Sequence, residues 1–196
     1  FIEEWSRFAE DIGIDLFDVI NAIRKRPTHS NIRQPGFGVG GYCLTKDPLF
    51  AKAAAKQIFN LDNHDFPFSS SAVKINNLMP VVTLNKMTKF FGKNIKDKNI
   101  LLMGVSYREE IADTRYSPSE IFYKKAHKLG IKITPQDPLV NYWEETGLKV
   151  ISDIPDLKSY DVIIFAVQHN EYKKISFKKI LKSNKNILIF DANNVL

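Results

Sequence analysis

The chain has 196 residues, enough for one large domain or two small ones, and its 44% hydrophobic residues suffice for a buried core. No run approaches the roughly 18 apolar residues that a membrane-spanning helix needs, and we expect no signal peptide. The single cysteine excludes an internal disulfide framework and indicates a reducing compartment, so we expect a cytoplasmic protein.

The formal net charge of +6 suggests an anionic partner. Lysines are concentrated between residues 173 and 185, and a basic stretch can mark nucleic-acid binding. These lysines are interspersed with Ile175, Phe177, Ile180 and Leu181, which is typical of the solvated face of an amphipathic helix. We therefore expect no nucleic-acid and no membrane partner, and the modest charge suits an anionic small molecule such as a nucleotide.

Apolar residues at helical spacing predict that the first part of the chain is helical. We expect helices over residues 1–12, 15–26, 49–58 and 69–91, with a glycine-containing loop at 28–47 and a connection at 60–68. The periodicity begins at Phe1 with no capping residue before it, so we expect part of a longer protein, cut within a helix. The long apolar helix at 69–91 is either a core helix or a dimer surface, and its pattern favours neither.

Strands alternate with helices in the second part of the chain. We expect strands at 100–105, 131–134, 150–151, 162–167 and 187–190, with a helix at 117–129. This alternation is typical of a parallel sheet with right-handed crossovers. We therefore predict an α/β protein with a helical domain at 1–92 and a Rossmann-like parallel-sheet domain at 93–196.

The turn after the first predicted strand lacks a dinucleotide fingerprint. Residues 106–115 do not contain the Gly-x-Gly-x-x-Gly spacing that brings backbone against a pyrophosphate. They carry instead Arg108 and Arg115, directly before the capping sequence Ser117-Pro118-Ser119-Glu120. These arginines could bind a phosphate at the helix start. They could equally pair with their acidic neighbours, which are Glu109, Glu110 and Asp113.

The loop at 36–47 contains the only cysteine. Glycines at 36, 38, 40 and 41 let its backbone approach a ligand closely, and Cys43 is followed by Lys46 and Asp47. A thiol becomes a nucleophile when a nearby cation or base favours its thiolate, and Asp47 could orient a water or take a proton. A lone cysteine is more often a buried hydrophobe, but this combination favours a catalytic thiol. No two histidines have metal-ligand spacing, so we expect no metal site.

Residues 35–48 read Pro-Gly-Phe-Gly-Val-Gly-Gly-Tyr-Cys-Leu-Thr-Lys-Asp-Pro and resemble the catalytic cysteine motif of the UDP-glucose/GDP-mannose dehydrogenase family. Residues 104–108, 113–118 and 137–138 are similar to that family's carboxyl-terminal nucleotide-sugar-binding domain. The resemblance covers essentially the whole chain. It implies an enzyme with an amino-terminal NAD domain, not contained in these residues, a central helical dimerisation domain and a second, Rossmann-like domain.

The resemblance implies a reaction: the C6 alcohol of a UDP-sugar, UDP-glucose or a UDP-N-acetylhexosamine, is oxidised to the uronic acid with two NAD. A first hydride transfer gives an aldehyde, to which Cys43 adds as a thiohemiacetal. A second gives a thioester, which water hydrolyses with help from Asp47. We expect a homodimer formed through the central domain, and no activity from this fragment alone.

The resemblance also assigns substrate and cofactor contacts. It implies that Tyr107 and Arg108 contact the nucleotide sugar, and that Lys46 and Arg115 lie near NAD, together with Cys43. The loop that wraps the substrate through its backbone matches Gln34, Phe37, Gly38, Val39 and Gly40. The alternative function is a non-catalytic UDP-sugar-binding and dimerising module from a split or degenerate gene.

Overall fold

The first part of the protein is helical, as expected. The computed structural model describes residues 1–184 and 186–196; Lys185 and the side chains of Phe177, Lys179 and Ser183, part of the predicted amphipathic helix, lie outside the described part. The helices of the first part are α1 (Ile2–Asp11), α2 (Leu16–Arg24), α3 (Phe50–Gln57) and α4 (Pro67–Phe91). Asp15 caps α2 by accepting a hydrogen bond from the N–H of Phe17 at 2.8 Å.

A four-stranded parallel sheet forms the second part. Its strands are β1 (Ile100–Met103), β2 (Ile133–Gln136), β5 (Val162–Phe165) and β6 (Leu188–Asp191), in the spatial order β2-β1-β5-β6. Ile100 lies opposite both Ile133 and Val162, and Val162 lies opposite Leu188, so the strands run parallel and in step. The predicted fold class, a helical region followed by a Rossmann-like parallel sheet, is confirmed.

The remaining elements connect the strands. α5 (Pro118–Lys128) joins β1 to β2, α6 (Phe177–Ser183) joins β5 to β6, and the antiparallel pair β3 (Tyr142–Trp143) and β4 (Leu148–Lys149) follows β2. Short 3-10 helices are η1 (Pro27–His29), η2 (Asp47–Leu49), η3 (Gly92–Asp97), η4 (Leu157–Ser159) and η5 (Tyr172–Lys174). The strand expected at 150–151 is reduced to one bridge, between Ile151 and Gln136. In α6, Ile180 is buried whereas Lys178 and Lys182 are exposed, which matches the solvated face inferred from the sequence.

Apolar side chains cover both faces of the sheet, because alternate strand residues point to opposite sides. On one face, Leu102 and Ile164 pack in a core cluster with Met87 of α4 and with Phe122 and Ala126 of α5. On the other face the cluster comprises Leu101, Met103, Ile163, Phe165, Tyr172, Ile180, Ile187 and Val195. The sheet is therefore fixed from both sides, and the carboxyl ends of its strands form a rigid edge.

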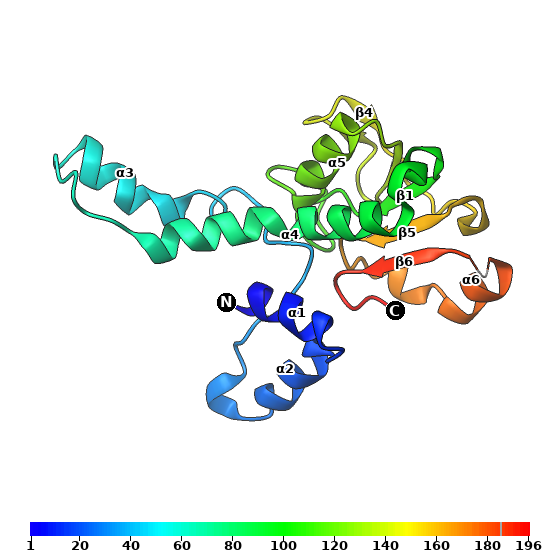
Figure 1. Ribbon diagram of the computed structural model, residues 1–196, viewed down its shortest axis with the longest axis horizontal. Coiled ribbons are helices and arrows are strands. Elements are labelled where there is room, and N and C mark those ends of the chain that lie inside the picture. The colour runs from blue at the N-terminus through cyan, green and yellow to red at the C-terminus, as the bar shows by residue number, and fades with distance from the viewer. Residues whose placement is uncertain (185) are drawn as a thin grey trace.

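The core reading of the long apolar helix holds for the second half of α4, and the dimer-surface reading of its first half stays a prediction. Its second half places Leu84 and Met87 in the sheet core, whereas Phe68 in its first turn is 81% exposed. Figure 1 shows the first half of α4 and α3 extending together away from the sheet. Among the described residues, α4 included, no helix combines the length and the apolar character needed to cross a bilayer.

Candidate functional site

The glycine loop is packed tightly against the turn that joins β1 to α5. A Cβ atom added to Gly40 would lie 2.8 Å from Tyr107 Cβ, 2.9 Å from Pro118 Cδ and 2.9 Å from the carbonyl oxygen of Tyr116. Gly41, with a φ of +90°, lies against the Tyr107 ring, which a Cβ atom would approach to 3.1 Å. The loop is therefore not a flexible linker. Glycine is needed at these positions because the β1–α5 turn occupies the space that a side chain would fill.

Cys43 is exposed and directly follows these glycines. A turn forms around it, because the N–H groups of Lys46 and Asp47 both donate to the Cys43 carbonyl oxygen, at 3.1 and 2.9 Å. Thr45 Oγ1 closes the turn by donating to the carbonyl oxygen of Gly41 at 2.8 Å. The thiol thus sits on a defined turn and is accessible, as a nucleophilic cysteine must be.

Lys46 and Asp47 form an ion pair with each other, with 2.7 Å between Nζ and Oδ1. The hydrogen bond to Asp47 raises the pKa of Lys46. The ammonium lies 4.1 Å from the centroid of the Tyr42 ring and 4.6 Å from that of Phe50, so two aromatic faces also hold it. The pair is neutral as a whole, and it fixes the Lys46 ammonium on the turn that carries Cys43.

A cavity of about 510 Å³ lies between the cysteine loop and the carboxyl ends of β1 and β5. This edge is where ligands bind in open parallel sheets. Cavity-lining residues that the sequence singled out are Gly38, Val39, Gly40, Cys43, Tyr107, Arg108 and Arg115. Residues predicted from two distant parts of the sequence thus meet in one cavity, while Lys46 and Asp47 lie outside its lining.

Two of the predicted substrate contacts are engaged elsewhere. The amide nitrogen of Gln34 donates to Asn21 Oδ1 at 2.7 Å. Phe37 is buried, and its ring centroid lies 5.7 Å from that of Phe122 in α5. Phe37 therefore anchors the loop in the core of the second part and does not line the cavity.

The two arginines of the predicted phosphate site differ in their partners. Arg115 forms a forked ion pair with Asp113, with Nη2 2.6 Å from Oδ2 and Nε 3.0 Å from Oδ1. The hydrogen bonds from Arg115 lower the pKa of Asp113, so this carboxylate is charged. The guanidinium of Arg108 has no ion pair or hydrogen bond with any described residue, and it lines the cavity. Arg108 is therefore the arginine whose charge is available to an anion.

The predicted capping sequence of α5 is only half realised. Ser117 Oγ accepts a hydrogen bond from the N–H of Ser119 at 3.2 Å and donates to the carbonyl oxygen of Ser106 at 3.1 Å. Glu120, the expected reciprocal partner, pairs instead with Lys124 at 2.5 Å. Ser117 Oγ therefore already accepts from the Ser119 N–H, which is not left free for a ligand at the amino end of α5.

Asp137, the first residue after β2, occupies the turn that follows β1. Its Oδ2 accepts hydrogen bonds from the N–H groups of Val105 and Ser106, at 2.9 and 3.0 Å. Burial acts to raise the pKa of Asp137, but hydrogen bonds from His169, Ser106 and Leu139 outweigh it and the pKa is lowered. In dinucleotide-binding folds the N–H groups of this turn face a pyrophosphate. Here a buried carboxylate takes them, so the turn does not fit NAD, in agreement with the missing glycine fingerprint.

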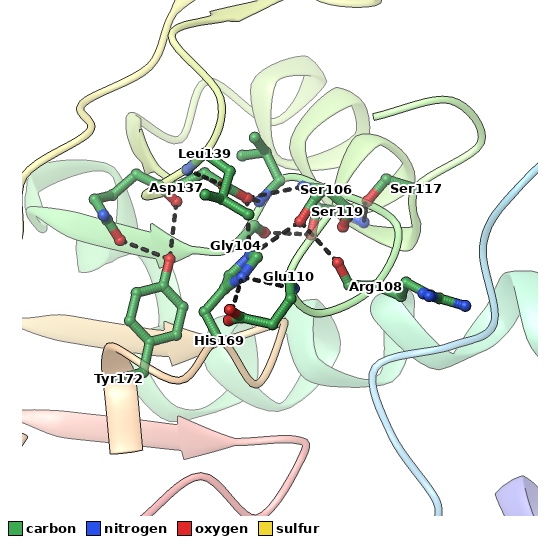
Figure 2. A network of polar contacts seen from close by, with 12 residues as sticks. Gly104, Ser106, Arg108, Glu110, Ser117, Ser119, Asp137, Leu139, His169 and Tyr172 are labelled. Carbon is green, nitrogen blue, oxygen red and sulfur yellow. Dashed lines mark hydrogen bonds and ion pairs between the residues drawn. The ribbon is translucent and has the colours of Figure 1, made fainter. Parts of the chain in front are cut away.

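A buried histidine extends this network and holds the main chain of Arg108 (Figure 2). Nδ1 of His169 accepts a hydrogen bond from the N–H of Glu110 at 3.1 Å, so Nε2 carries the proton of the neutral ring. Nε2 lies 3.0 Å from Ser106 Oγ, which donates to the carbonyl oxygen of Arg108 at 3.1 Å. Figure 2 shows the Arg108 side chain pointing out of the network. The network therefore holds the main chain of Arg108 and leaves its guanidinium group unpaired among the described residues.

Sequence reasoning missed several residues of this arrangement. Neither Asp137, which belongs to the family resemblance at residues 137–138, nor His169 is linked to Arg108 by any pattern in the sequence. Asn76 and Asn193, which hold the glycine loop, carried no recognisable signal. Among the described residues, no group of three or more His, Cys, Asp or Glu side chains is placed to hold a metal ion.

Comparisons with known proteins agree in both parts of the chain. Residues 1–78 match the central domain of the UDP-glucose/GDP-mannose dehydrogenase family, and residues 101–196 match its UDP binding domain. UDP-N-acetyl-D-mannosamine dehydrogenase of Methanocaldococcus jannaschii is 30% identical over 98% of this chain and 43% of its own length. UDP-glucose 6-dehydrogenase of Rickettsia prowazekii is 25% identical over 100% of this chain and 46% of its own length.

Solved structures show the same similarity. The NDP-N-acetyl-D-galactosaminuronic acid dehydrogenase of Methanosarcina mazei superposes with a TM-score of 0.81 at 25% identity, covering 100% of this chain and 43% of that protein. The UDP-N-acetyl-mannosamine dehydrogenase Cap5O of Staphylococcus aureus gives 0.73 at 27% identity, with 100% and 44% covered. The chain therefore spans less than half the length of the relatives that it matches.

Proposed function

Because the chain belongs to the UDP-glucose/GDP-mannose dehydrogenase family, we propose that it forms the central and nucleotide-sugar-binding parts of an NAD-dependent nucleotide-sugar 6-dehydrogenase. The proposed substrate is a UDP-sugar, either UDP-glucose or a UDP-N-acetylhexosamine, and both types are named among the relatives. We place the boundary between a domain at 1–92 and a domain at 93–196 within η3, where the helical part gives way to the sheet.

The single observation that carries this proposal is the cavity shared by Cys43 and Arg108. Its volume of about 510 Å³ lies within the range of about 300–1,000 Å³ that is usual for small-molecule sites. A nucleotide sugar has a reactive sugar at one end and a diphosphate in its middle. The exposed thiol would react with the sugar, and the unpaired guanidinium of Arg108 would bind the diphosphate.

The chain's own part in the proposed reaction is covalent. The C6 alcohol is oxidised to an aldehyde, and the thiolate sulfur of Cys43 adds to its carbonyl carbon as a thiohemiacetal. Oxidation of this adduct gives a thioester, and water then releases the uronic acid and restores the thiol. Asp47 is bonded to Lys46 through Oδ1, so its other oxygen would orient that water.

NAD would accept the hydride lost in each oxidation. The turn after β1 does not fit a dinucleotide, so we propose that another part of the full enzyme binds it, with Cys43, Lys46 and Arg115 at the edge of that site. We further propose a cytoplasmic homodimer formed through the helical part. Trp5 and Phe8 on α1 are at least half exposed, as is Phe1 directly before it, and an exposed apolar surface of this kind is the support for a partner there.

The test is an NADH-release assay of the complete gene product with a panel of UDP-sugars. Cys43→Ser should abolish formation of the uronic acid while leaving UDP-sugar binding, measured by calorimetry, close to that of the unaltered protein. Arg108→Ala should weaken UDP-sugar binding. Unchanged turnover of Cys43→Ser would overturn the proposed role of the thiol. Tight UDP-sugar binding without turnover of any sugar would favour the alternative, a non-catalytic binding and dimerising module.

A further inference from the structure

We propose that Asn76, on α4, is a positioning residue that holds the glycine loop in place and thereby sets the location of Cys43. The catalytic part of this inference rests on the proposed function, whereas the contact itself does not. Asn76 lies 33 positions after Cys43 in the sequence and does not line the cavity that contains the thiol. Its effect on the reaction would therefore be exerted through the loop.

Asn76 makes two hydrogen bonds to a single loop residue. Its Oδ1 accepts from the N–H of Val39 at 2.7 Å, and its Nδ2 donates to the carbonyl oxygen of Val39, also at 2.7 Å. The side-chain amide thus pairs with the main chain of Val39 as a neighbouring β-strand would. Of the residues short enough to reach this position, only asparagine offers a donor and an acceptor together in one plane.

The loop crosses α4 where the helix contains a proline. Pro80 has no N–H group, so it cannot donate the ordinary helical bond to the carbonyl oxygen of Asn76, four residues earlier. Gly38 passes this carbonyl group: a Cβ atom on Gly38 would lie 3.4 Å from the oxygen and 3.2 Å from Pro118 Cγ. The loop therefore lies between α4 and α5, where Asn76 binds Val39 through its side chain and Gly38 packs against its carbonyl group.

A second asparagine holds the loop from the sheet. Asn193, which follows β6, accepts a hydrogen bond from the N–H of Phe37 at 3.4 Å and donates to the carbonyl oxygen of Phe165 in β5 at 3.2 Å. The loop is thus attached to the sheet at Phe37 and to α4 at Val39. Only residues 40–42 separate the second attachment from Cys43.

The attachment has a consequence for substrate contacts. The N–H of Val39 is already donated to Asn76, so Val39 would contribute to a substrate site by its position and not by donating this bond. Small displacements of a reacting group are costly in catalysis: about 1 Å of misplacement can cost about 100-fold in rate. Loosening Val39 should therefore slow a reaction at Cys43 more than it weakens substrate binding.

The test compares Asn76→Ala, which removes both bonds, with Asn76→Asp, which keeps the acceptor for the Val39 N–H. Asn77→Ala is the matched control, because Asn77 is the exposed next residue of the same helix. Amide hydrogen exchange of the loop peptide is measured on the 196-residue protein. Cys43 is its only cysteine, so the rate of reaction with a thiol reagent reports that residue alone.

We expect Asn76→Ala to speed exchange at Val39 by about tenfold or more, because it loses both hydrogen bonds to the Val39 main chain. Asn76→Asp retains an acceptor for the Val39 N–H but sets a carboxylate oxygen where Nδ2 donates to the Val39 carbonyl oxygen, so its exchange at Val39 should lie between that of Asn76→Ala and that of the unaltered protein. Asn77→Ala should match the unaltered protein in both measurements. In the complete gene product, kcat of Asn76→Ala should fall about 10- to 100-fold with KM little changed.

Equal exchange at Val39 in Asn76→Ala and the unaltered protein would overturn the attachment, as would the same change in Asn77→Ala. Faster exchange with unchanged Cys43 reactivity and unchanged kcat would overturn the positioning role. If Asn76→Ala does not fold, Asn76→Asp decides the matter: exchange at Val39 equal to that of the unaltered protein would overturn the attachment, and faster exchange with unchanged Cys43 reactivity would overturn the positioning role. Absence of turnover in the unaltered gene product would count against the proposed function and leave the attachment standing on its exchange data.

Discussion

Replacing Gly40 with alanine should disturb the candidate site through a single added methyl group. The new Cβ atom would lie within 3.0 Å of Tyr107 Cβ, Pro118 Cδ and the carbonyl oxygen of Tyr116. None of these atoms is the end of a flexible side chain, so either the loop or the β1–α5 turn must move. Overpacking of this kind costs about 1–3 kcal/mol, and we expect Gly40→Ala to lower the free energy of unfolding by that amount.

Urea-induced unfolding measures this loss, and the reaction rate of Cys43 with a thiol reagent shows whether the loop has moved. Gly13→Ala is the control: Gly13 has a φ of +74° and open space around its Cα. It should cost about 1 kcal/mol through backbone strain and leave Cys43 unaffected. The reasoning would be refuted if Gly40→Ala were as stable as the unaltered protein, or if both variants changed Cys43 reactivity equally.

Three further predictions concern buried groups. Burial raises the pKa of Glu3 to about 7 from 4.5, so the folded protein binds this proton more tightly than the unfolded chain and loses stability as the pH rises through that range. Glu3→Gln should abolish this loss, up to about 3 kcal/mol, in urea unfolding at pH 4.5 and 8; a persisting loss would contradict it. Gly104→Ala should cost about 3 kcal/mol or more, because its Cβ would lie 2.5 Å from Val167 Cβ at a φ of +98°; chemical denaturation at one pH tests this. Asp137→Ala should cost about 3–5 kcal/mol by leaving buried N–H groups without an acceptor, and Asp137→Asn, which keeps an oxygen, should cost less.

The sequence was most informative where one residue type has one strong structural meaning. Alternating strands and helices predicted the parallel sheet, because a strand-helix-strand order permits few arrangements. The glycines before Cys43 predicted a close approach of backbone, and the structure shows what they approach: the Tyr107 side chain and the start of α5. The position of the loop relative to the sheet, however, depends on packing between segments far apart in the chain.

The residues that sequence reasoning missed act across long separations. Asn76 lies within a helical pattern, where a polar residue ordinarily indicates a solvent-facing position. Its pairing with Val39 depends on where the loop crosses α4, which no local pattern encodes. The sequence also left open whether the two arginines pair with their acidic neighbours, since Asp113 and Glu109 are equally available by spacing. Only the folded turn shows that Arg115 is paired while Arg108 is not.

Because the carboxylate of Asp137 binds the N–H groups of the turn after β1, the folding of this turn does not depend on a bound ligand. A protein whose N–H groups bind a phosphate from solution gains a stability that rises with the logarithm of the phosphate concentration. Here the anion is the side chain of Asp137, so it occupies the turn whether or not a nucleotide is present. The turn that carries Arg108 is therefore ordered without any ligand, and the free energy of binding a ligand would not be needed to assemble it.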